Sequence, residues 1–299
     1  MTGGLLDIIN GNLLGDACVR VWRGKYFYYK HTAKDKRYLE WLADLLDELR
    51  VTIYIVTDNP KAGTYALGFY INKSRVESLL NLRKKWYRSA NGKTVKIIPE
   101  DIELNPTVLL HWYLGDGSLV RQKGNRVPRI VLATNNFSKQ YIDFLIEKLR
   151  DIGLNFYPLQ SFSGFKNGAK CGRVLISKTS DGTPFRFFKL IGIRCPEEIK
   201  KCFTGNKGRG SKRHYFGGKW PNEEDWLRTL HNAPIGKIIK ERRVELGMSQ
   251  GQLARKVKIG KNTIKRVERG VRYPGVSLFR KLLNTLKINP LYLLELIGD

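Results

Sequence analysis

Two aspartates occupy matching positions in two similar apolar segments, INGNLLGDAC with Asp16 and LLHWYLGDGS with Asp116. Each segment predicts a helix that ends at a Gly-Asp pair and is followed by a strand-like stretch. A carboxylate at a helix C-terminus lies in the negative end of the helix dipole, which is unfavourable for the anion alone. A divalent cation between two such carboxylates removes this cost, and Mg²⁺ prefers hard oxygen ligands. We therefore expect the helices to pack side by side, with Gly11 and Gly15 allowing a close approach.

The composition favours a nucleic acid as the partner. The chain has 299 residues, enough for two or three domains, and 42% of them are hydrophobic. It carries 54 Lys and Arg against 27 Asp and Glu, a formal net charge of +27 that favours a polyanion. No apolar run approaches the ~20 residues of a spanning helix, so a membrane is not expected. The four Cys form no CxxC pair and indicate reduced thiols in an intracellular protein that acts at DNA.

The order of elements predicted for residues 1–100 recurs in residues 101–203. In each copy a helix ending in the aspartate precedes a strand pair, an amphipathic helix, a second strand pair and a final helix. The segment KRYLEWLADLLDELRV is echoed by KQYIDFLIEKLRDIGL, and residues 92–99 are predicted to be a short basic connector. Two copies of one αββαββα unit mimic a symmetric dimer in which each copy supplies one carboxylate.

The combination of these motifs resembles the LAGLIDADG homing endonucleases of the monomeric, two-motif type. The similarity covers residues 5–203 and includes the KRYLEWL helix, the run WYRSANGKTVKIIPEDIELNPTVLLHWYLGDGS and the segment ATNNFSKQ. It implies an α/β (α+β) fold, duplicated about a pseudo-twofold axis, with saddle-shaped antiparallel sheets along the DNA major groove. The motif helices would form the interface between the halves, and both strands would be cut to leave short 3′ overhangs.

The resemblance also implies metal-dependent hydrolysis, in which divalent ions polarise the scissile phosphates and lower the pKa of the attacking water. Mg²⁺ is the expected ion, and Mn²⁺ or Ca²⁺ could replace it in binding. The expected metal site comprises Asp16, Asp116, Gly15 and Gly115.

Each half of such enzymes contributes a lysine that stabilises charge on the phosphate. The matching positions are Lys96 and Lys201, with Lys200 as the alternative to Lys201. His31 and Asn135 lie in segments that, in relatives, carry polar residues organising water near the metals. A plain strand residue touching phosphate is the alternative for His31.

Two residues depart from the family pattern. Ala17 replaces the usual terminal Gly of the first motif, which matters if the position needs a positive φ. His111 stands where a smaller or apolar residue is common. Neither change removes an acid, so activity is expected, with slower cutting of one strand if the first site is distorted.

The outward faces of the strand pairs are expected to contact DNA. Alternation places Val19 and Tyr29 on one face, and basic and aromatic residues on the other. Arg and Lys read guanine edges, and many of them only bind phosphates. The candidates are Arg20, Trp22, Arg23, Lys25, Tyr28, Lys30, Arg121, Lys123, Arg126 and Arg129. Weaker candidates in the second strand pairs are Lys61, Lys166, Lys170 and Arg173.

Residues 204–233 are predicted to be a basic linker. The stretch TGNKGRGSKRHYFGGKW has five cations and no acid, and we expect it to lie along the phosphate backbone. A flexible tether that only aids solubility is the alternative. The candidate contacts are Lys207, Arg209, Lys212 and Arg213.

Residues 234–299 predict an all-α domain. A helix stopped by Gly247, the segment SQGQLARKV capped by Ser249, and KNTIKRVERG form a helix-turn-helix pattern with Gly260 in the turn. The pattern resembles the phage-repressor (Cro-like) class, which implies a recognition helix at residues 261–269. The candidate contacts are Gln250, Gln252, Lys261, Asn262, Thr263, Lys265 and Arg266, and the expected core residues are Leu253, Ala254, Ile264 and Val267.

Two functions from different classes follow. The first is a monomeric, site-specific, Mg²⁺-dependent endonuclease that breaks both strands of a long double-stranded DNA target. The second is a non-catalytic protein on the same scaffold, either a transcriptional regulator or a maturase that binds its host intron RNA. The presence of both Asp16 and Asp116 favours the endonuclease, because a non-catalytic derivative is free to lose them.

Overall fold

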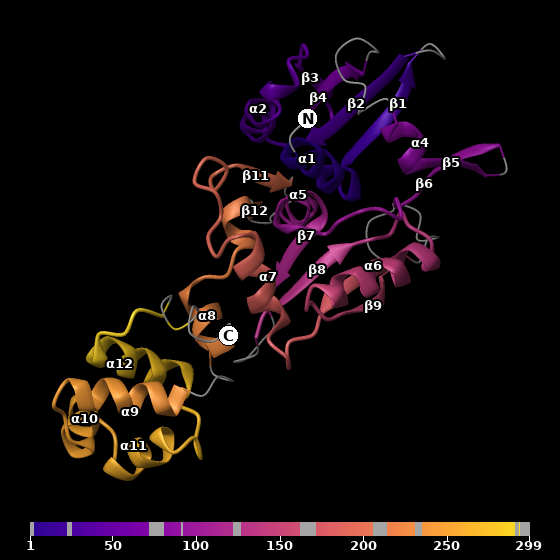
Figure 1. Ribbon diagram of the computed structural model, residues 1–299. Helices are drawn as coiled ribbons and strands as arrows, with labels where there is room; N and C mark the ends of the chain where they lie inside the picture. Colours follow the sequence, from indigo (N-terminus) through magenta and orange to yellow (C-terminus); the bar gives the residue numbers. More distant parts are fainter. Residues whose placement is uncertain are drawn as a thin grey trace. The chain divides into compact units, whose positions relative to one another are not determined.

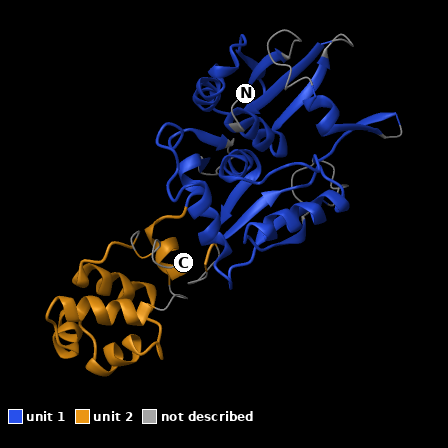
Figure 2. Ribbon diagram, viewed as in Figure 1, with its two compact units in different colours: residues 1–120, 129–220 blue, residues 121–128, 221–299 orange. Residues whose placement is uncertain are grey.

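The computed structural model describes residues 3–22, 26–71, 81–90, 92–121, 127–161, 172–205, 214–230, 235–290 and 293. The chain forms two compact units, one of residues 1–120 with 129–220 and one of residues 121–128 with 221–299 (Figure 2). No described helix has the length and apolar character that crossing a membrane requires. The first unit extends to Trp220, so the segment predicted as a linker, 204–233, is shared between the two units.

The first unit contains two copies of one arrangement (Figure 1). The first copy consists of α1 (Gly3–Leu14), β1 (Ala17–Trp22), β2 (Tyr26–Ala33), α2 (Lys36–Leu45), η1 (Asp47–Leu49), β3 (Tyr54–Asn59), β4 (Thr64–Ile71), α4 (Leu82–Trp86), β5 (Tyr87–Ala90) and β6 (Lys93–Lys96). The second consists of α5 (Pro106–Asp116), β7 (Gly117–Val120), β8 (Arg129–Ala133), α6 (Lys139–Asp151), β9 (Phe156–Ser161), β10 (Gly172–Ser177), α7 (Thr183–Ile191), β11 (Phe203–Gly205), β12 (His214–Tyr215) and η2 (Phe216–Lys219).

The two large sheets have the same strand order, β1-β2-β4-β3 and β7-β8-β10-β9, and every neighbouring pair is antiparallel. This confirms the predicted duplication with antiparallel sheets. In the first sheet Tyr29 lies opposite Val19 and Phe69, and its ring stacks on Phe69 at 4.8 Å between centroids. These residues are buried, because alternation along a strand directs every second side chain to the helix-covered face.

Helices α1 and α5 pack against each other through glycine. A Cβ on Gly11 would come within 2.5 Å of the Val108 carbonyl oxygen and 2.7 Å of the His111 Cβ, so no larger residue fits. Helix α5 begins with Asn105, whose side chain accepts a hydrogen bond from Val108 N, and with proline in its first turn. The predicted side-by-side packing of the two motif helices is therefore confirmed.

Each copy ends in a small hairpin that the sequence analysis did not foresee. Residues 92–99 are not a plain connector, because β6 pairs with β5 from Tyr87–Lys96 to Ala90–Lys93. In the second copy β11 pairs with β12, within the segment predicted as linker. The sequence Asn-Gly between the paired residues Ala90 and Lys93 is a typical two-residue hairpin signal, which the basic composition obscured, and Gly92 has a φ of +72°.

The second unit contains α8 (Glu223–Leu230), α9 (Ile235–Glu245), α10 (Gln250–Lys256), α11 (Lys261–Glu268) and α12 (Val276–Leu286). Its core includes Phe279 and the four predicted residues Leu253, Ala254, Ile264 and Val267. Helix α10 starts with a capping box, in which the Ser249 hydroxyl accepts from Gln252 N and the Gln252 side chain accepts from Ser249 N. Of the last predicted helix, 290–297, the described residues are 290 and 293.

Candidate active site

The two aspartates lie where the ends of α1 and α5 meet. A Cβ on Gly15 would be 3.4 Å from the Gly115 Cα, and a Cβ on Gly115 would be 3.6 Å from Oδ2 of Asp16. Asp16 is exposed and Asp116 is half-buried as residues, so a ligand can reach them, although the packed helix ends remove much of the water around both carboxyl groups. The fold therefore brings together two carboxylates separated by 100 positions in the chain.

A lysine binds the carbonyl groups at the end of each motif helix. Nζ of Lys96 donates to the carbonyls of Ala17 at 2.9 Å and Gly15 at 3.4 Å. Nζ of Lys219 donates to three carbonyls at the end of α5, of Tyr113 at 3.3 Å, Leu114 at 2.6 Å and Gly115 at 3.4 Å. Carbonyls at a helix C-terminus lack intrahelical partners, and a cation there offsets the negative end of the dipole.

The second lysine beside the aspartates is Lys219, which the sequence analysis missed. The predicted candidate Lys201 is exposed, and its neighbour Lys200 donates to the Glu197 carboxylate. A signal was present in the sequence, since Lys96 ends β6 and begins KIIP, and Lys219 ends η2 and begins KWP. The long connection at 206–213 displaced this match from the position that simple counting suggests.

Asp16, Asp116, Lys96 and Lys219 shift one another's pKa values. Burial raises the pKa of Asp116 to about 7, with Asp16 adding to the rise and Lys96 and Lys219 opposing it. Burial also raises the pKa of Asp16, and the same two lysines oppose that rise. For both lysines burial is the main cause that lowers the pKa, to about 8, while the two aspartates act to raise it. The site is a compact group of two acids with raised pKa values and two lysines with lowered pKa values.

The donor set fits a hard divalent cation. Two accessible carboxylates that repel each other are stabilised by a cation, and their oxygens are the ligands that Mg²⁺ and Mn²⁺ accept. Among the described residues no group of three or more His, Cys, Asp and Glu side chains could hold a metal. The described residues would thus offer a metal two carboxylates, and oxygens of water or substrate would supply the remaining ligands. Gly15 and Gly115 were also predicted to belong to the metal site. Their carbonyl groups accept hydrogen bonds from Lys96 and Lys219, respectively.

His31 and His111 are buried beside the site. Neither ring nitrogen of His31 has a hydrogen-bond partner within the described part of the chain, and its ring lies 5.7 Å from that of Tyr38. Burial lowers the pKa of His31 to about 3, with His111 and Lys96 adding to the effect, and burial lowers that of His111 to about 4. His31 follows Tyr29 by two positions, so strand alternation already placed it on the covered face rather than against phosphate.

The structure answers the question about φ at Ala17, whereas the role expected for Asn135 stays a prediction. Ala17 is absent from the described non-glycine residues with positive φ, and its counterpart Gly117 has φ −86°. A Cβ on Gly117 would lie 2.1 Å from the Tyr113 ring, so the second motif needs glycine for space and not for φ. Asn135 lies against Gly172, where a Cβ would come within 2.4 Å of its Oδ1.

The described DNA-contact candidates fall into different environments. Strand pairing puts Arg20, Tyr28 and Lys30 on the face opposite to Val19, as alternation predicted, and Lys30 pairs with Asp58. Arg129 lies opposite Val120, whereas Arg121 belongs to the second unit and pairs with the buried Asp225 at 2.8 Å. The side chain of Trp22 and residues Arg23, Lys25, Lys123, Arg126, Lys207, Arg209, Lys212 and Arg213 lie outside the description, as do the weaker candidates Lys166 and Lys170.

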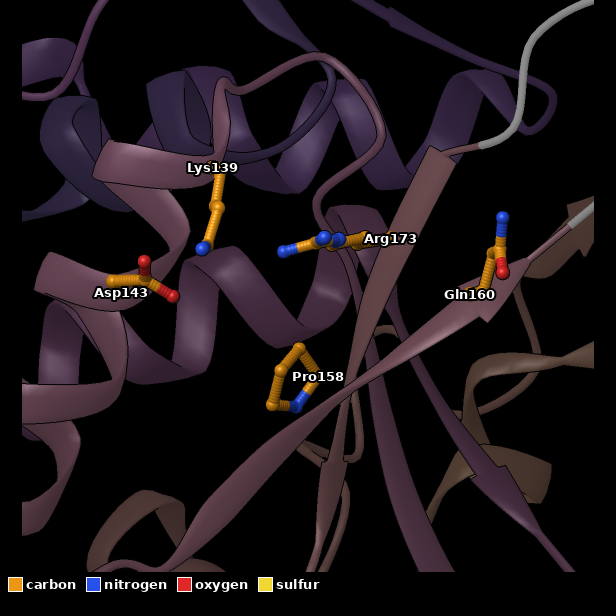
Figure 3. A pocket seen from close by; sticks show the side chains of 5 residues that line it. All are labelled: Lys139, Asp143, Pro158, Gln160 and Arg173. Carbon is orange, nitrogen blue, oxygen red and sulfur yellow. The ribbon is translucent and has the colours of Figure 1, made fainter.

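Arg173 lines a pocket on the helix side of the second sheet. The cavity of about 550 Å³ is lined by Lys139, Asp143, Pro158, Gln160 and Arg173. Figure 3 shows Lys139 and Asp143 from α6 and Arg173 from β10 directed toward the same space. The strand register puts Arg173 on the same face as the buried Leu175, so it is not an outward residue of the sheet.

In the second unit Lys261, Asn262, Lys265 and Arg266 are exposed on α11, and Thr263 is half-buried. The two glutamines expected to contact DNA have partners inside the unit. Gln250 donates to Glu268 at 2.8 Å, and Glu268 forms a buried ion pair with Arg243, while Gln252 completes the capping box. The exposed surface of α11 is therefore basic.

The duplicated αββαββα unit, with a carboxylate from each copy at the helix interface, defines a pseudo-symmetric protein of the LAGLIDADG fold class. The family model described as LAGLIDADG DNA endonuclease matches residues 6–162, and a helix-turn-helix model matches residues 239–293. The chain belongs to the LAGLIDADG DNA endonuclease family.

Similar proteins include one curated relative and several solved structures. The uncharacterized protein MJ1098 of Methanocaldococcus jannaschii is 32% identical over 151 residues, which cover 49% of this chain and 55% of that protein. The chain thus spans about half the length of this relative. The structure of the homing endonuclease I-WcaI bound to its DNA recognition sequence matches with 22% identity and a TM-score of 0.46, covering 66% of this chain and 84% of that one. The structure of I-DmoI with DNA and Mn matches with 17% identity and a TM-score of 0.38, covering 63% and 96%.

Proposed function

We propose that the protein is a site-specific endonuclease that cuts both strands of double-stranded DNA with the help of divalent metal ions. The observation that carries this proposal is the meeting of Asp16 and Asp116 at the helix interface, with a lysine beside each. Family membership and the net charge of +27 agree with a DNA substrate. Because one chain supplies both carboxylates, a monomer is sufficient for both cuts.

In this mechanism Asp16 and Asp116 would hold the metal, which would supply charge stabilisation at the phosphate and lower the pKa of the attacking water. Lys96 and Lys219 stand next to the same carboxylates and are charged at neutral pH, since their pKa is lowered only to about 8. Their ammonium groups stabilise negative charge that develops on the phosphate oxygens. Each is held at the end of its own motif helix, so the two copies offer one acid and one lysine each to the two strands.

The second unit adds DNA contacts in this proposal. The exposed side chains at the start of α11 are Lys261, Asn262, Lys265 and Arg266, and a recognition helix presents such residues to the major groove. The helix-turn-helix match also favours the second candidate function, a non-catalytic DNA-binding regulator. A maturase that binds intron RNA is a third candidate function. The cleavage experiment below separates the endonuclease from these two non-catalytic candidates.

The test is cleavage of a plasmid that carries the DNA flanking the coding frame, joined without the frame. Wild type, Asp116→Asn and the control Asp101→Asn are compared with Mg²⁺, Mn²⁺, Ca²⁺ and no metal. Asp101 is an exposed acid paired with Lys85, so its loss leaves the site intact. We expect metal-dependent linearisation by wild type and the control, and none by Asp116→Asn. Tight binding without cleavage under every metal supports the regulator and overturns the endonuclease.

A further inference from the structure

The hairpin β5–β6 projects from the body of the first unit (Figure 1). The residues exposed along it are Arg88, Ser89, Gly92, Lys93, Thr94 and Val95. An isolated two-stranded hairpin is at best marginally stable in water. This one needs support at its base, and its exposed part offers a surface to a partner.

The base of the hairpin is fixed to strand β1, directly after Asp16. The Tyr87 hydroxyl accepts a hydrogen bond from Val19 N at 2.9 Å, and Arg83 donates to the Val19 carbonyl at 2.6 Å. Lys96, which pairs with Tyr87 across the hairpin, donates to the Ala17 carbonyl. These contacts use polar groups of an edge strand, and they set the position of the hairpin relative to the two carboxylates.

The hairpin is basic. Residues 87–96 include Arg88, Lys93 and Lys96 and no Asp or Glu. Arg88 lies opposite Val95 and Lys93 lies opposite Ala90, so the two exposed cations share one face of the ribbon. A phosphate backbone is the polyanion that complements this face, because each contact with Lys or Arg releases a bound counterion.

We infer that β5–β6 is a DNA-binding arm, whose Arg88 and Lys93 contact backbone phosphates beside the cleavage position. The inference rests on the proposed endonuclease function and adds residues outside the two large sheets and α11. Four residues of strand extend about 13 Å from the base of the hairpin at Lys96. Along the axis of a DNA duplex this length corresponds to about four nucleotides of one strand. The second copy has a hairpin in the equivalent place before Lys219, and its connection reads NKGRGSKR.

The test compares Arg88→Ser/Lys93→Ser with the control Lys36→Ser/Arg150→Ser in the full chain. The control removes the same two types of charge from exposed positions on α2 and α6. Affinity for the duplex that wild type cleaves is measured without metal between 50 and 200 mM salt. Two lost phosphate contacts reduce the slope of log affinity against log salt by about 1.8. Between 50 and 200 mM salt, the fold-decrease in affinity should therefore be about ten times smaller for the arm variant than for wild type. The control should show the same decrease as wild type.

The position of the contact is tested with duplexes that carry one uncharged methylphosphonate at a time. Wild type should bind less tightly when the neutralised phosphate lies within about four steps of the cut. The arm variant should be insensitive at those positions and retain the wild-type response elsewhere. An unchanged salt slope, or an unchanged methylphosphonate profile, overturns the arm while leaving the endonuclease intact. If wild type binds no DNA at all, both proposals fail.

Discussion

Lowering the pH from 7.5 to 5.0 is expected to destabilise the first unit through His31 of the first copy and His111 of the second. Both rings are buried, and their pKa values are lowered from 6.5 to about 3 and about 4. Below pH 6.5 the unfolded chain takes up protons on these rings and the folded chain does not. Their contribution is fully present above pH 6.5 and is lost as the pH falls toward their folded pKa values.

The size of the effect follows from the two shifts. A pH of 5.0 is about 1.5 units below the pKa of histidine in the unfolded chain, so the unfolded rings are protonated. Both folded rings remain neutral at this pH. Each ring therefore lowers the free energy of unfolding at pH 5.0 by about 2 kcal/mol relative to pH 7.5, and the two rings together lower it by about 4 kcal/mol. Asp116 acts in the opposite direction, because its pKa, raised to about 7, lets the folded state bind a proton in this range, and the raised pKa of Asp16 has the same sign.

The variant His31→Gln/His111→Gln separates these contributions, because it removes the two titrations and leaves the aspartates. The free energy of unfolding of the first unit is measured at both pH values by hydrogen exchange of the β2 amides in increasing urea. Wild type should lose about 4 kcal/mol more than the variant between pH 7.5 and 5.0. An equal pH dependence of the two proteins would refute the neutral, buried state of the histidines.

Three further predictions concern helix packing, capping and the second lysine. Gly11→Ala should destabilise the first unit by about 1–3 kcal/mol in thermal unfolding, because its Cβ meets the facing helix. The control Gly4→Ala, with nothing within 4 Å, should be neutral or stabilising. Ser249→Ala should lower the unfolding free energy of the second unit by about 1 kcal/mol in urea, and an unchanged value would contradict the capping box. Lys219→Gln should slow single-turnover cleavage on the order of 10²-fold, and Lys201→Gln should leave it unchanged. If only Lys201→Gln slows cleavage, Lys201 is the second lysine of the site.

The sequence by itself determined most of the helices and strands, their duplication and the positions of the two aspartates at the ends of the motif helices. These features are local, since hydrophobic periodicity and turn residues act over one helix or one strand pair. The apolar runs before Asp16 and Asp116 each predicted a helix, and α1 and α5 are found there. The helix-turn-helix core of Leu253, Ala254 and Ile264 was likewise readable from 3.6-residue spacing.

Tertiary structure decided which side chains meet. Lys219 reaches the end of α5 after a hairpin whose connection is longer than that of β5–β6, and spacing along the chain does not encode where such a loop closes. Strand register assigned Arg173 to the pocket under α6 and Arg88 and Lys93 to one face of a ribbon. One residue of register exchanges the two faces of a strand, so these outcomes depend on long-range pairing that local patterns leave open.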